Sequence, residues 1–100
     1  MDKLSILKSV KRSKIIDNLN SDEIRIYLIL LANSGENGDG KILLSVIYGV
    51  LGEGFSTDRL KASCRKLAEY GLIEVPASSM EQVKGDKSKL VYKIFPVKQG

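Results

Sequence analysis

The chain of 100 residues contains no histidine and a single cysteine, Cys64. Without histidine, it has no imidazole base, no histidine-assisted nucleophile and no histidine metal ligand. One cysteine cannot form an internal disulfide or a structural zinc site, and this usage is typical of a reducing cytoplasm. We therefore expect a cytoplasmic protein that is not an enzyme and needs neither a cofactor nor a metal.

Long apolar stretches and nucleotide-binding motifs are also missing. No apolar run reaches the roughly 18 residues of a membrane span, and the N-terminal region lacks the apolar block of a signal peptide. No glycine-rich segment continues into the Gly-Lys-Ser or Gly-Lys-Thr of a P-loop. Asn33, Asn37 and Asp39 have partial calcium-loop spacing, but Leu44 occupies the place of the closing glutamate.

The charges that are present are segregated along the chain. The net charge is +4, yet residues 17–55 carry six carboxylates against two cations. The excess of cations lies in residues 1–16, 56–69 and 78–98. A scatter of charges for solubility accounts for the total but not for this partition, which is expected of a surface that binds a nucleic-acid backbone.

The segment 55–75 predicts one well-marked helix followed by a strand. Ser56 is a suitable N-cap, and Phe55 and Leu60 have the spacing of a hydrophobic staple. Gly71 can adopt the left-handed conformation that ends a helix, and Leu72 can then fold back on Leu67. We therefore expect a helix over residues 56–70.

The two faces of this helix differ in chemistry. At helical spacing, Leu60, Cys64, Leu67 and Ala68 fall on one face, where Cys64 is expected to be a buried structural thiol. The other face combines cations with a small residue and two carboxylates: Asp58, Arg59, Ala62, Arg65, Lys66 and Glu69. Such a face suits a major groove, but any amphipathic helix also has a solvated polar face.

The string R-K-L-A-E-Y-G-L-I-E-V, residues 65–75, followed by a polar loop and a second strand, resembles the end of the recognition helix and the start of the wing in winged helix-turn-helix proteins. The resemblance covers residues 21–96. It implies an α+β fold with a three-helix core and a β-hairpin wing. The N-terminal segment 1–20 is an addition to this domain, and 97–100 is a tail.

The segments before the marked helix supply the remaining elements. Residues 3–19 have an imperfect helical repeat on a basic background, with apolar Leu4, Leu7, Val10, Ile15 and Leu19, and we expect them to pack on the domain or on a second copy of it. Ser21 is expected to cap a core helix with apolar residues nearly all round. Residues 33–40 form an exposed loop.

Two further elements complete the expected domain. Residues 41–43 predict a short strand, and Leu43, Val46, Ile47, Val50 and Leu51 have the spacing of a helix that packing must support. After Gly71, segments 72–75 and 90–95 alternate as the strands of a long-looped hairpin with wing 77–89. Its lysines either contact phosphates or discourage pairing at an edge strand.

The residues and the resemblance together predict a transcriptional regulator that binds double-stranded DNA. We expect Arg59, Ala62 and Arg65 to contact base edges, while Ser56, Thr57, Lys61 and Lys66 hold phosphates. The resemblance implies phosphate contacts for Lys84, Lys87 and Lys89 of the wing. A homodimer through residues 3–19 is the expected assembly.

A different class of function fits the same fold. Some winged helices are protein-interaction modules, or accessory proteins of larger transcription, replication or mobile-element assemblies. The basic face of the helix 56–70 favours DNA, whereas Asp58 and Glu69 dilute its charge. The DNA sequence, the regulated process and any small-molecule effector are not encoded in a recognisable motif.

Overall fold

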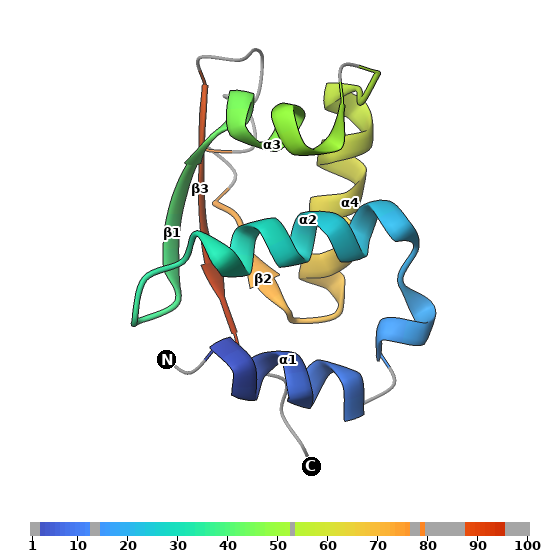
Figure 1. Ribbon diagram of the computed structural model, residues 1–100, viewed down its shortest axis with the longest axis vertical. Helices are drawn as coiled ribbons and strands as arrows, with labels where there is room; N and C mark the ends of the chain where they lie inside the picture. Colours follow the sequence, from blue (N-terminus) through green and yellow to red (C-terminus); the bar gives the residue numbers. More distant parts are fainter. Residues whose placement is uncertain (1–2, 13–14, 53, 77–78, 80–87, 96–100) are drawn as a thin grey trace.

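Helix α2, Ser21–Ala32, lies across the middle of the molecule, with the other elements packed around it. The computed structural model describes residues 3–12, 15–52, 54–76, 79 and 88–95. In Figure 1, α3 (Leu44–Leu51) lies above α2, α4 (Thr57–Glu69) lies beside it, and α1 (Lys3–Arg12) lies below. The described residues form a small α+β domain with four α-helices and a three-stranded antiparallel sheet.

The start of α2 is fixed by Asn20, not by Ser21 as predicted. The Asn20 side chain accepts a hydrogen bond from the Glu23 backbone N–H at 2.8 Å, and a Glu23 carboxylate oxygen accepts one from the Asn20 N–H at 3.3 Å. This capping box satisfies two backbone donors at once, which a serine cap at position 21 would not achieve here. Ser21 is instead the first helical residue.

The predicted burial of α2 is only partly correct. Ile26, Tyr27, Leu30 and Leu31 are buried, but the side chain of Leu28 is 44% exposed. A helix that is apolar nearly all round gives no periodic signal for the side that remains open. The packing of the sheet, α3 and α4 decides it, and Leu28 falls on the uncovered side.

The sheet has the order β1-β3-β2, with β1 at Asp39–Leu43, β2 at Ile73–Glu74 and β3 at Lys89–Ile94. The expected hairpin and the expected pairing of the first strand with it are both confirmed. Side chains of β3 alternate strictly between exposed and buried, so one face of the sheet covers the helices and the other is open.

Gly40 and Tyr92 join this sheet to α2. They are opposite one another in β1 and β3, and a Cβ atom at Gly40 would overlap the Tyr92 ring. The Tyr92 hydroxyl donates a hydrogen bond of 2.6 Å to the Leu30 carbonyl of α2. The absence of a side chain at Gly40 therefore allows an aromatic ring to bridge two layers of the core.

Helix α1 packs on the domain through Ile6 and Val10, which lie one turn apart and are both buried. The prediction that Leu4 belongs to the apolar face was wrong, because its side chain is 60% exposed. Residues two positions apart on an α-helix point in directions about 200° apart around its axis, so Leu4 and Ile6 cannot share a face. A 3₁₀ helix, η1 at Ile15–Asn18, and the buried Leu19 lead into α2.

The apolar face predicted for α3 is only partly correct, because it included the buried Ile47 but not Leu44. Leu44 and Ile47 are fully buried, whereas Val46 and Val50 are 44% and 65% exposed. All its side chains are uncharged, so the sequence pattern could not distinguish its inner from its outer side. Within the described part of the chain, no helix has both the length and the apolar character needed to cross a bilayer.

Candidate nucleic-acid interface

The first turn of α4 is built as the sequence predicts. Ser56 is the N-cap, and its hydroxyl accepts a hydrogen bond of 3.1 Å from the Arg59 backbone N–H. Phe55 before the cap and Leu60 after it are both buried in the same cluster. This arrangement satisfies the definition of a hydrophobic staple and fixes the direction in which the chain enters the helix.

The end of α4 is equally well defined. Gly71 has a φ of 73°, and its N–H bonds the Ala68 carbonyl at 2.9 Å. The Leu72 N–H bonds the Leu67 carbonyl at 3.1 Å, and both leucine side chains are fully buried. These two bonds form a Schellman motif, so the predicted helix end is confirmed. The chain then passes directly into β2.

The buried face of α4 consists of Leu60, Ser63, Cys64 and Leu67. The prediction placed Ala68 on this face, but Ala68 is exposed and Ser63 takes its place. Ser63 lies three residues after Leu60 and four before Leu67, which puts it between them on the helix surface. Ala68 lies at the rim, where neighbouring elements do not cover it.

Three buried groups have strongly raised pKa values. Burial raises the pKa of the Cys64 thiol to about 12, and it does the same for the phenols of Tyr27 and Tyr92. In each case the cause is desolvation, which penalises the charged form. Cys64 is thus a neutral, buried thiol, as expected, and not a reactive thiolate.

The outer face of α4 is open and carries cations. Ala62, Arg65 and Lys66 are exposed, and Lys61 is half-buried. Lys66 Nζ lies 3.9 Å from a Glu69 carboxylate oxygen and 5.4 Å from the centre of the Tyr70 ring. Lys61 and Arg65 have no hydrogen bond or ion pair with any residue that the structure describes. Their charges are therefore available to an anionic partner.

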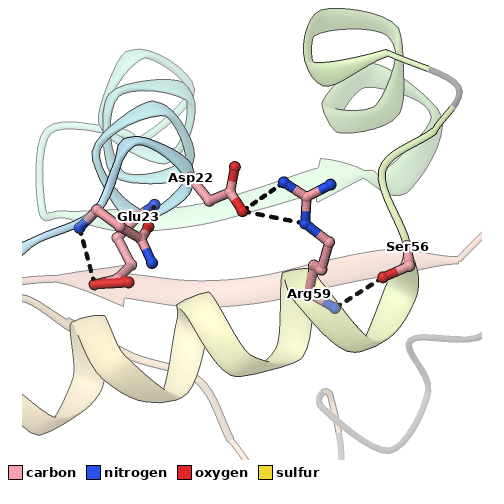
Figure 2. A network of polar contacts seen from close by, with 5 residues as sticks. Asp22, Glu23, Ser56 and Arg59 are labelled. Carbon is pink, nitrogen blue, oxygen red and sulfur yellow. Dashed lines mark hydrogen bonds and ion pairs between the residues drawn. The ribbon is translucent and has the colours of Figure 1, made fainter.

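Arg59 differs from these cations because it has an internal partner. Its Nη2 and Nε atoms donate to one Asp22 carboxylate oxygen at 2.7 and 3.2 Å, as Figure 2 shows. Its guanidinium also lies 4.5 Å from the centre of the Phe55 ring. Arg59 therefore connects the first turn of α4 to the first turn of α2, although 53% of its side chain remains exposed.

The hydroxyl groups at the start of α4 also have structural partners. Thr57 Oγ1 lies 3.0 Å from the Tyr48 hydroxyl of α3, and Ser56 is occupied as the cap. Asp22 and Tyr48 are residues that the sequence pattern did not identify as part of this region. Neither has a local signal, because Asp22 is 37 residues from Arg59 and Tyr48 is nine from Thr57.

The predicted wing residues are separated from this face or fall outside the described residues. Lys89 is exposed on the outer face of the sheet, opposite Leu43. The neighbouring Ser88 carbonyl accepts a hydrogen bond from the Leu44 N–H, so Lys89 lies beside the start of α3. Lys84 and Lys87 lie outside the described residues.

The outer face of the sheet contains a depression of about 350 Å³ lined by Asp39, Glu74, Pro76, Val91, Tyr92 and Lys93. Lys93 is opposite Asp39 in β1 and Glu74 in β2, so the charges there are mixed. This surface is therefore less suited to an anionic polymer than the outer face of α4. No cluster of potential metal ligands occurs among the described side chains.

Comparisons with known proteins give no match: no family model, no curated protein and no solved structure is similar to this chain. A function must therefore be inferred from the order of the elements and from the chemistry of the exposed side chains.

Proposed function

We propose that this chain is a winged helix-turn-helix protein that binds duplex DNA and acts as a transcriptional regulator in the cytoplasm. Helix α4 enters the major groove, and the hairpin between β2 and β3 contacts the backbone. The binding energy comes mainly from phosphate contacts, and sequence preference comes from side chains that contact base edges.

The order of the elements supports the proposed fold class. Strand β1 lies between α2 and α3 in the chain, and the hairpin of β2 and β3 follows α4. β1 pairs with β3, which gives the sheet the order β1-β3-β2. This is the arrangement that the resemblance of residues 21–96 implies. α3 and α4 are joined by a short turn, as in a helix-turn-helix unit.

The observation that carries the proposal is that three cations on α4 have no strong partner within the described chain: Lys61, Arg65 and Lys66. The opposite face of the same helix is buried, so these cations are held at a fixed orientation on a rigid element. Arg65 and Lys61 are unpaired within the described chain, and Lys66 has long contacts with Glu69 and with the Tyr70 ring. A duplex binds to such a surface by replacing its condensed counterions.

A protein-interaction module is the second candidate, and one observation favours it. The apolar side chains of Val46 and Val50 are exposed on α3, a helix without charged residues, and Leu43 just before it is exposed as well. Exposed apolar groups of this kind are found at protein interfaces. The proposed homodimer through residues 3–19 would have to use other side chains than Ile6 and Val10, which are already buried within one chain, whereas Leu4 is exposed.

Salt-dependent binding to random duplex DNA distinguishes the two candidates. For DNA binding, we expect the logarithm of the association constant to fall linearly with the logarithm of salt concentration, with a slope of about −0.9 per phosphate contact. The variant Arg65→Glu/Lys66→Glu should lose binding while its far-ultraviolet circular dichroism stays unchanged. Both side chains are exposed, so the core is not affected.

A matched control separates local contacts from net charge. Lys8→Glu/Lys41→Glu changes the net charge by the same amount on exposed residues of α1 and β1. This control should retain most of the affinity. Equal binding by the α4 variant and the wild type would refute the assigned face, and no binding by the wild type would leave the protein-interaction module as the better proposal.

A further inference from the structure

The exposed face of α4 has an internal order that its net charge conceals. Successive residues of an α-helix are separated by about 100° around the axis. Asp58, Ala62, Arg65 and Glu69 lie within about 30° of one line, the direction opposite the buried residues of α4, so these four residues form the centre of the face. Arg59 and Lys66 flank this line on the edge next to α2, and Lys61 flanks it on the other edge.

The two carboxylates on the central line are in different states. Asp58 is exposed and has no hydrogen bond or ion pair with any described side chain, whereas Glu69 lies 3.9 Å from Lys66 Nζ. Ala62 between them is exposed and too small to cover its neighbours. Besides Arg65 and the paired Glu69, the centre of the face therefore presents one free acceptor and one methyl group.

A carboxylate on the middle of a DNA-facing helix requires a chemical explanation, because phosphates repel it. In the major groove it can accept a hydrogen bond from the exocyclic amino group of cytosine, while a methyl side chain can contact the methyl group of thymine. The cations on both edges of the helix are placed to contact the phosphates on the two sides of the groove.

We infer that Asp58 recognises a cytosine amino group and that Ala62 contacts a thymine methyl group. Both assignments rest on the proposed function. Four residues of helix span about 6 Å along the axis, which is roughly two base-pair steps. The preferred site therefore contains a cytosine and a thymine about two steps apart, with Lys61 and Lys66 on the flanking phosphates.

Asp58 also has a structural role that is independent of DNA. It lies in the first turn of α4, where a negative charge interacts favourably with the helix dipole. A loss of stability on substitution would therefore prove nothing about recognition. The informative measurement is the identity of the preferred base, which a purely structural role does not change.

The test is selection of bound duplexes from a randomised pool with the wild type and with Asp58→Asn. We expect the wild type to enrich cytosine at one position, with a preference of about 5- to 150-fold over the other bases. Asparagine pairs in a bidentate manner with adenine, so Asp58→Asn should change the preferred base at that position to adenine. The other positions should keep their preferences.

Glu36→Gln is the matched control, because it removes an exposed carboxylate in the loop before β1 and not on α4. This variant should keep the cytosine preference. A wild type that binds duplex DNA without base preference, or an Asp58→Asn variant with the wild-type preference, would overturn the assignment and leave DNA binding intact. A wild type that shows no salt-dependent binding to random duplex would instead refute the proposed function itself.

Discussion

Helices α3 and α4 follow one another in the chain, but their boundaries are fixed in different ways. α4 has a side-chain cap at Ser56 and a Schellman motif at Gly71. α3 begins after Leu43, which makes no side-chain cap hydrogen bond, and contains Gly49 in its interior. Local chemistry therefore specifies α4, whereas α3 depends on the packing of Leu44 and Ile47 against the rest of the domain.

The outer faces of α3 and α4 also differ, in the charge of their exposed side chains. The exposed side chains of α4 include cations that the fold does not need, with the exception of Arg59, which bonds Asp22. The exposed side chains of α3 are uncharged, and Val50 is its most open large residue. This contrast supports the proposal that α4, and not α3, contacts an anionic polymer.

The largest expected effect concerns apolar residues on the two helices. Leu67→Ala should lower the free energy of unfolding by about 2–5 kcal/mol, because it leaves a cavity beneath α4. Val50→Ala in α3 should change it by less than about 0.5 kcal/mol, because the side chain is 65% exposed. Urea denaturation measures both. Equal losses would show that Val50 is covered in solution, for example by a second copy.

Two smaller effects of opposite sign are expected when the glycine that ends α4 and the glycine inside α3 are replaced. Gly71→Ala should destabilise the protein by about 1 kcal/mol, since its φ of 73° is strained for any residue with a Cβ atom. Gly49→Ala should stabilise it by about 0.4–1 kcal/mol, because a helix interior favours alanine. A Cβ atom at either position meets no neighbour within 4 Å, so steric overlap does not complicate the comparison. Thermal unfolding of the two variants should shift in opposite directions.

The sequence predicted most accurately those elements whose signals are local. The start of α4 at Ser56, its end at Gly71 and the hairpin that follows were identified from neighbouring residues. The buried faces of α1 and α3 were predicted less well, because tertiary contacts choose between faces of similar composition. Ile6 was missed and Val46 was wrongly expected to be buried for this reason.

The candidate site shows the same limit. The spacing of Ala62, Arg65 and Lys66 was sufficient to place them on the outer face of α4, where all three are exposed. The partners of Arg59 and Thr57 could not be predicted, because Asp22 and Tyr48 approach them only after the helices pack. The assignment of base contacts to Arg59 stays a prediction, since its guanidinium would have to leave Asp22 or bind DNA while paired with it.

The last comparison tests whether α3 and α4 act as one unit. Tyr48→Phe removes the hydroxyl that lies 3.0 Å from Thr57 Oγ1 and should cost about 0.5–1.5 kcal/mol of stability. A double-mutant cycle with Thr57→Val isolates this bond, because the second substitution should cost less once the Tyr48 hydroxyl is gone. The salt slope of DNA binding should stay unchanged, because no cation is removed. A coupling of zero would mean that this bond does not stabilise the position of α3 against α4, and the first turn of α4 would then be held mainly by the Arg59–Asp22 contact.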